Sequence, residues 1–316
     1  MLEFVNKLAE EVEKKYPEIR LQTFAYLYTE EPPKSDIKPR KNVYVRLCNT
    51  TSNQVTGAAG NKKFMERLKR WAGIAHTIYV WDYAIVFWEK VTGLPFPSEF
   101  SYPGVYKLYA ENNVQGLFWE QEEVDIADMS DLKYYLHSKY MEKPFRKDFI
   151  FLFRDFMQKY YGPAEKYISA YRQVLLQCAK KSDVQISWFP HACDFRYIDP
   201  VSMKRIQDLF AKARSAVKGD KTLSLRVDRA AMGIARIAGY EFPWYYQKYV
   251  DTESARKRFV QTWKACKERG RIPKKQDQII SMLETALTAH KAVRKPEEFK
   301  GIKHLDFPGV LINCMT

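Results

Sequence analysis

The sequence has few cysteines and no long apolar run. Its five cysteines stand at positions 48, 178, 193, 266 and 314 and form no CxxC pair, which excludes a zinc ribbon, a thioredoxin-type motif and a disulfide scaffold. We expect buried free thiols. No stretch of about 18 apolar residues occurs, so we expect no transmembrane helix. The N-terminal region lacks the apolar core of a signal peptide. The default expectation is a cytoplasmic protein that makes no contact with a membrane.

The signature loops of several enzyme classes are also missing. No GxGxxG follows an expected strand, no GxxxxGK[ST] loop occurs, and neither a GxSxG elbow nor an HExxH pair is present. Rossmann dinucleotide-binding domains, P-loop NTPases, α/β-hydrolases and zincins are thereby excluded. His191 and Cys193 lie close in the sequence, but a metal site needs about four groups. We therefore expect neither a cofactor nor a metal ion.

The positive charge is confined to the second part of the chain. The net charge of +14 comes from 52 Lys and Arg against 38 Asp and Glu. Residues 1–145 hold 19 of these bases and 20 of the acids, so residues 146–316 hold the remaining 33 and 18. The shift predicts a domain boundary near residue 145, and it restricts any polyanion-binding surface to the C-terminal part. The bases that could form such a surface are Arg226, Arg229, Arg236, Arg256, Lys257, Arg258, Lys264, Lys267, Arg269 and Arg271.

Residues 1–145 alternate between helical and extended patterns. Apolar spacing predicts helices over 2–15, 62–75, 104–112 and 129–143, and β-favouring runs predict strands over 19–28, 42–48, 76–87 and 114–120. Short apolar strands between helices indicate a parallel sheet covered by helices, either doubly wound or part of a (β/α)8 barrel. Aromatic and acidic residues at the strand ends favour the barrel, whose chemistry collects at the carboxyl ends of its strands.

Residues 146–316 have helical patterns throughout. These patterns cover residues 146–162, 163–181, 199–217, 222–240, 252–270 and 273–291, and the tail HLDFPGVLINC could add a short strand. The expected fold is therefore α/β plus α. About four βα units of a partial (β/α)8-type barrel occupy residues 1–145, and an all-helical domain occupies residues 146–316.

Two strand ends carry the candidate chemistry. Asp82 lies between Trp81 and Tyr83, and Glu120 lies between Trp119 and Gln121. The two acids are 38 residues apart, about one βα unit, and neighbouring parallel strands are about 4.8 Å apart. We therefore expect the two carboxyls within roughly 5–10 Å of each other, a range that covers retaining and inverting glycoside hydrolysis. The aromatic neighbours suit a sugar, whose C–H faces stack on indole and phenol rings.

Three further residues could line the same pocket. Tyr26 and Tyr28 end the first strand, and Arg46 lies in the second. Each position has a structural alternative. Asp82 could cap the following helix, and Arg46 could form a structural ion pair with Asp82 or Glu120.

Several segments resemble one known family. They are FVNKLAEEVEKKYPEIRLQTFAYLYTEEPPKSDIKPRKNVYVRLC, the WDY and GLFWEQ strand ends, LKYYLHSKYMEKPF, FMQKYYGPAEKYISAY and RVDRA. Together they resemble DUF4838, a bacterial family of domains of unknown function, over about residues 1 to 240. The resemblance implies a glycoside-hydrolase-like (β/α)8 barrel followed by a helical region, often behind an alpha-glucuronidase-type N-terminal domain. By position, it implies that Asp82 and Glu120 are carboxylates on late barrel strands.

The sequence departs from this family pattern in three places. NTTSNQVTG replaces a Cys-containing stretch after RLC, and Glu122 replaces a Gly after the Glu-Gln pair. Relatives also have strands before the FVNKLAEEV helix. A barrel needs eight strands and about 250 residues, so an acid on an earlier strand is expected to be absent from this chain.

The leading hypothesis is a carbohydrate-active protein that resembles glycoside hydrolases. In it Asp82 and Glu120 act as base or nucleophile, and aromatic side chains stack on an oligosaccharide. Such a protein could be inactive alone, or could need an N-terminal barrel half or self-association. The first alternative is a non-catalytic glycan-binding or interaction module, and the second is a basic helical polyanion binder. No nucleic-acid-binding module is recognisable, so nucleic acid is not the expected partner.

Overall fold

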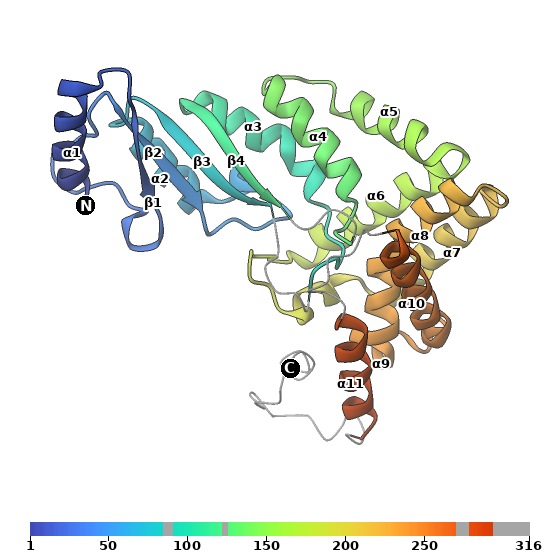
Figure 1. Cartoon of the computed structure of the whole chain (residues 1–316). Helices are drawn as coiled ribbons and strands as arrows, with labels where there is room; N and C mark the ends of the chain where they lie inside the picture. Colours follow the sequence, from blue (N-terminus) through green and yellow to red (C-terminus); the bar gives the residue numbers. More distant parts are fainter. Residues whose placement is uncertain (85–90, 122–125, 270–277, 293–316) are drawn as a thin grey trace. The chain divides into compact units, whose positions relative to one another are not determined.

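The computed structural model describes residues 1–84, 91–121, 126–269 and 278–292 (Figure 1). The chain divides into two compact units. Unit 1 comprises Met1–Val86, Ser98–Gln121 and Leu136–Phe149, and unit 2 comprises Phe87–Pro97, Glu122–Tyr135 and Ile150–Thr316. The helices that the structure describes include none with both the length and the apolarity to cross a membrane.

Unit 1 is built on a sheet of four parallel strands in the order β1-β2-β3-β4. The strands are β1 (Leu21–Ala25), β2 (Val43–Asn49), β3 (Ile78–Ala84) and β4 (Val114–Gln121). The helices are α1 (Leu2–Lys15), α2 (Lys62–Ala72), α3 (Tyr102–Glu111) and the second half of α4 (Ser130–Glu142). The prediction of a parallel sheet is confirmed, and α2 and α3 connect its later strands, β2 to β3 and β3 to β4. The connection from β1 to β2 contains a short 3₁₀ helix, Leu27–Thr29, in place of an α-helix.

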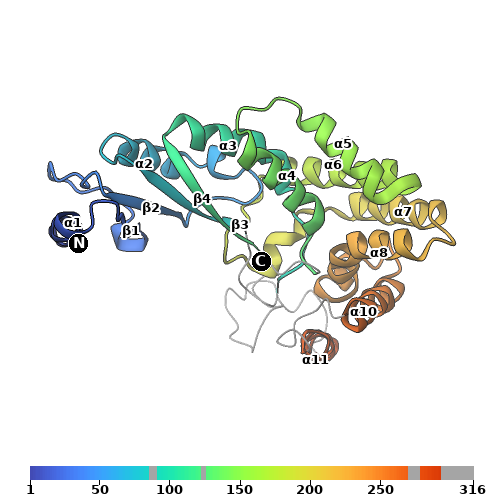
Figure 2. The same ribbon diagram turned by 45° about the horizontal axis from the view of Figure 1, so that its top comes forward.

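One face of the sheet packs against helices. In both views α2 and α3 lie on the same side of the sheet (Figures 1 and 2). The core contains Val45, Leu47, Ile78 and Val80 from the strands, and Phe64, Leu68, Trp71, Val105 and Tyr109 from the two helices. Alternate residues of a strand point to opposite faces, so the intervening strand residues lie on the other face.

Local signals position the two helices. The Asn61 side chain accepts a hydrogen bond from the backbone N–H of Phe64, 3.1 Å away, and so caps the start of α2. Pro103 occupies the first turn of α3, where its missing N–H costs nothing. Arg67 of α2 is buried and binds Glu30 at 2.7 Å. This ion pair ties α2 to the loop that follows β1.

Unit 2 is helical in its described residues. Its helices are the first half of α4, most of α5 (Phe149–Tyr161), α6 (Glu165–Ser182), α7 (Pro200–Ala216), α8 (Lys221–Arg236), α9 (Pro243–Tyr246), α10 (Thr252–Glu268) and α11 (Ile279–Ala292). A π-helical turn, Ile237–Glu241, follows α8. The prediction of a helical region is confirmed for these residues. The tail predicted as a strand lies outside the described ranges.

Two buried charge clusters organise the interior of unit 2. Asp128 forms ion pairs with Arg172 at 2.9 Å and with Lys133 at 3.0 Å. Arg236 pairs with Glu241 at 2.8 Å, and both side chains are almost fully buried. Buried charges persist only when they are paired in this way, so we read these clusters as structural.

Candidate functional site

The strand register decides which predicted site residues meet. Asp82 lies beside Trp119 on the neighbouring strand, and Glu120 lies beside Tyr83. Since consecutive strand residues point to opposite faces, Asp82 and Glu120 point to opposite faces of the sheet. The structure therefore does not bring the two carboxylates together in one cleft.

Asp82 lies on the face that α2 and α3 cover. Its carboxylate accepts a hydrogen bond from the Tyr109 hydroxyl at 2.6 Å and another from the Asn49 amide at 2.9 Å. Ser52 donates in turn to the Asn49 side-chain oxygen at 2.5 Å. Burial raises the pKa of Asp82, although the two hydrogen bonds act in the opposite direction. Asp82 thus joins β2, β3 and α3 through hydrogen bonds beneath the helices.

The opposite face of the sheet is lined with aromatic rings. We call it the aromatic face; it consists of Phe24, Tyr44, Arg46, Cys48, Tyr79, Trp81, Tyr83, Phe118 and Glu120. Trp81 occupies its centre, with ring centroids 5.7 Å from Phe24 and 4.3 Å from Phe118. Phe24 and Phe118 remain 44% and 43% exposed. Large apolar side chains with this exposure form a platform that a ligand can reach.

Glu120 is the acidic residue of this face. Its carboxylate accepts a hydrogen bond of 2.6 Å from the Trp81 indole N–H. Tyr83 lies beside Glu120 in the register, and Tyr26 reaches Tyr83 from the end of β1. Burial, Cys48 and Tyr26 together raise the pKa of Tyr83, so its hydroxyl stays protonated. Glu120, Trp81, Tyr83 and Tyr26 therefore gather at the carboxyl end of the sheet.

Arg46 is held by rings instead of acids. Its guanidinium carbon lies 5.9 Å from the Phe24 ring, 5.8 Å from that of Tyr79 and 5.9 Å from that of Trp81. These are cation–π distances. Its Nε is buried and has no hydrogen-bond acceptor among the described residues. In the described residues Arg46 contacts these rings and forms no ion pair with Asp82, which lies on the opposite face of the sheet, or with Glu120.

The other predicted site residues lie elsewhere. Trp119 is on the helix-covered face and contacts His137. Gln121 shares that face, and its side-chain oxygen is buried without a partner in the described part of the chain. Tyr28 is 84% exposed in the short turn Leu27–Thr29. Of the nine predicted site residues, the structure gathers Glu120, Trp81, Tyr83, Tyr26 and Arg46.

Sequence reasoning missed Phe24, Tyr79 and Phe118, which complete the platform. The alternation of side chains along each strand could have identified them. Tyr44, Arg46 and Cys48 recur at every second position, and so do Tyr79, Trp81 and Tyr83. Reading the WDY tripeptide as one cluster ignored this period of two, which sends Asp82 to one face and both aromatic neighbours to the other.

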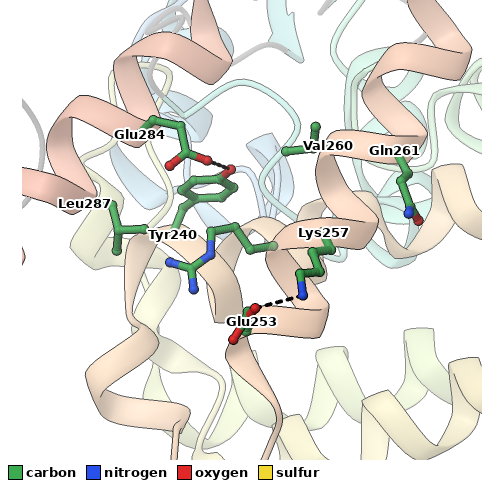
Figure 3. Close-up of a pocket in the computed structure, with 8 residues that line it drawn as sticks. Tyr240, Glu253, Lys257, Val260, Gln261, Glu284 and Leu287 are labelled. Atoms are coloured by element: carbon green, nitrogen blue, oxygen red, sulfur yellow. Dashed lines mark hydrogen bonds and ion pairs between the residues drawn. The ribbon is translucent and has the colours of Figure 1, made fainter.

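One cavity of the described structure belongs to unit 2 and contains none of the predicted site residues. It has a volume of about 620 Å³ beside α10 and α11. Figure 3 shows Tyr240 pointing toward Glu284, to which it donates a hydrogen bond, and Lys257 toward Glu253 at 2.7 Å. Its carboxylates thus already have partners.

Several bases of the expected polyanion-binding surface are engaged inside unit 2. Arg229 binds Asp131 at 3.1 Å, and Arg236 is the buried partner of Glu241. Arg226 stacks 4.2 Å above the Tyr160 ring. Arg271 lies outside the described residues. The described helices therefore offer fewer available cations than the sequence suggests.

Comparison with known proteins gives one match. The family model described as Domain of unknown function (DUF4838) matches residues 1–173, a range that includes the whole sheet and the aromatic face. No curated protein and no solved structure matches the chain. Since this model covers more than half of the 316 residues, the chain belongs to the DUF4838 family.

Proposed function

We propose that the aromatic face binds a carbohydrate and that Glu120 is the carboxylate that acts on it. The observation that carries this proposal is the Trp81–Glu120 pair. An indole on a partly exposed ring platform donates at 2.6 Å to a carboxylate at the carboxyl end of a parallel sheet. Rings offer stacking surfaces to sugar C–H groups, and a carboxylate accepts hydrogen bonds from sugar hydroxyls.

The proposed reaction class is hydrolysis of an O-glycosyl bond in the manner of glycoside hydrolases. Such reactions use two carboxyl groups that flank the scissile bond. Glu120 supplies one of them as base or nucleophile. The only other acid in the four described strands, Asp82, lies on the opposite face of the sheet and is occupied by Tyr109 and Asn49. The second carboxylate therefore comes from outside these strands.

We propose a (β/α)8 barrel as the setting that supplies it. Parallel strands with helices on one face and a carboxylate at their carboxyl ends match the wall of such a barrel. A barrel has eight strands, so further βα units, or a second copy of this chain, would complete the wall. Strand β1 lies at an edge of the sheet, and Phe4 and Leu8 of the neighbouring α1 are 67% and 47% exposed. Such an edge favours association.

Titration calorimetry with a panel of oligosaccharides tests the binding proposal, and release of aryl glycosides and aryl uronides tests hydrolysis. We expect Trp81→Ala to weaken binding at least tenfold. We expect Glu120→Gln, whose amide oxygen still accepts from the indole, to abolish hydrolysis while binding persists. The matched control is Glu111→Gln, because Glu111 is an exposed residue of α3 that is paired with Lys107. Equal effects of the Glu120 and Glu111 substitutions would overturn the proposal.

The second candidate is a non-catalytic glycan-binding module. It is favoured by the separation of Asp82 from Glu120, which leaves one carboxylate on the aromatic face. It predicts oligosaccharide binding without turnover in every association state of the chain. Glycoside release by the wild type that Glu120→Gln abolishes would exclude it.

A further inference from the structure

Arg46 is the feature of the aromatic face that a neutral sugar leaves unexplained. The four described strands contain three charged residues: Arg46, Asp82 and Glu120. Asp82 faces the helices, so Arg46 and Glu120 are the charged pair of the aromatic face. Glu120 already accepts from the Trp81 indole. Arg46 makes no ion pair with any described residue, and its buried Nε has no acceptor there.

The rings hold the guanidinium in place without neutralising it. Phe24, Tyr79 and Trp81 each lie 5.8 to 5.9 Å from it. Aromatic faces attract a cation but offer no acceptor to its N–H groups. A guanidinium presents a planar fork of donors that matches a carboxylate or a sulfate. Its positioning by three rings reduces the entropy lost when such a group binds.

From this arrangement we infer that the ligand of the aromatic face is an acidic saccharide whose carboxylate or sulfate binds Arg46. The inference rests on the proposed function and names the substrate class of the same site. Trp81 separates the two charges, since its ring contacts Arg46 and its N–H contacts Glu120. The acidic group therefore points toward Arg46, and an uncharged part of the saccharide meets Glu120, which would repel an anion.

The register supports this orientation of the ligand. Arg46 lies beside Tyr79, two positions before Trp81, and Glu120 lies beside Tyr83, two positions after it. Gly116, beside Tyr79, leaves room for that ring, because a Cβ there would stand 2.6 Å from it. The ring can thus lie across β4 and remain near Arg46.

The test compares three ligands by titration calorimetry on the full chain: trigalacturonate, its neutral methyl ester and a sulfated neutral trisaccharide. A charge-assisted hydrogen bond contributes about 1.5–3 kcal/mol, so we expect one of the acidic ligands to bind about tenfold or more tightly than the ester. The tighter of the two acidic ligands identifies carboxylate or sulfate as the recognised group.

The Arg46 variants test whether this residue causes the preference. Arg46→Gln should remove the preference for the acidic ligand without weakening the binding of the ester, and Arg46→Lys should keep part of the preference. The control is Arg70→Gln, because Arg70 is an exposed arginine of α2.

Each outcome decides the inference. Equal affinity of wild type for all three ligands overturns it while the proposed function stands, and this comparison needs no variant. A preference that survives Arg46→Gln also overturns it. If none of the three ligands binds, the substrate class inferred here is refuted. If the oligosaccharide panel also fails to bind, the proposed function is refuted as well.

Discussion

Substitutions of Asp82 distinguish a structural role of this residue from a catalytic one. Replacing it with Ala leaves the Tyr109 hydroxyl and the Asn49 amide without an acceptor in a buried site. An orphaned buried donor costs about 1–3 kcal/mol. Two such donors, partly offset by removal of a desolvated carboxylate, give an expected loss of about 2–4 kcal/mol in the free energy of unfolding.

Asp82→Asn should behave differently. The side-chain oxygen of the new Asn can accept a hydrogen bond from Asn49, and the Tyr109 hydroxyl can turn to accept one from the new amide N–H. We therefore expect the free energy of unfolding to change by less than about 1 kcal/mol. Because burial raises the pKa of Asp82 above its ordinary value of 3.8, the folded state binds the proton more tightly than the unfolded state. Wild-type stability therefore falls as the pH rises from that value through the folded pKa, and the Asn variant lacks this fall.

Urea unfolding followed by circular dichroism at several pH values measures both variants against wild type. The stability difference between the Asn variant and wild type should shift in favour of the variant as the pH rises. Oligosaccharide affinity should be unchanged in Asp82→Asn. A purely structural role of Asp82 is refuted if Asp82→Ala costs less than about 0.5 kcal/mol in the free energy of unfolding, or if the Asn variant folds normally but loses binding or turnover.

Two further substitutions and one thiol-modification reaction test unit 1. Gly116→Ala places a methyl group 2.6 Å from the Tyr79 ring, so we expect a lower urea midpoint and weaker oligosaccharide binding; unchanged binding would contradict the role of that ring. Arg67→Ala leaves Glu30 as a buried carboxylate without its ion-pair partner, and should cost about 3–5 kcal/mol in urea unfolding. Burial raises the pKa of the Cys48 thiol to about 12, so iodoacetamide at pH 8 should leave it unmodified in the folded protein, as mass spectrometry of the peptides would reveal.

The sequence patterns predicted the parallel sheet of unit 1 for a physical reason. The strands are short, and the helices between β2 and β3 and between β3 and β4 each pack apolar side chains on the sheet. Such βα units leave few arrangements. Strand ends were harder to predict. The run over 19–28 forms a strand only over Leu21–Ala25, because the chain turns at Leu27, whose φ is +49°.

The candidate site could be predicted only in part. The residue types at the strand ends pointed to the carboxyl edge of the sheet, and the strand period of two could have separated Asp82 from Glu120. Their relation also depends on the register, which pairs Asp82 with Trp119 instead of Glu120. A shift of one residue would exchange the two faces of a strand. The position of Arg46 among three rings depends on side chains from β1, β2 and β3 at once.

The most direct test of the aromatic face observes the indole that lies at its centre. The chain has seven tryptophans, and labelling with ¹⁵N-tryptophan gives each indole N–H its own nuclear magnetic resonance signal, which single Trp→Phe variants assign. Titration with the tightest-binding oligosaccharide should shift the Trp81 signal most. The signal of Trp71, which is buried and donates to the Glu30 carbonyl at 2.7 Å, should stay in place. A shift confined to tryptophans off the aromatic face, with Trp81 unmoved, would contradict the account.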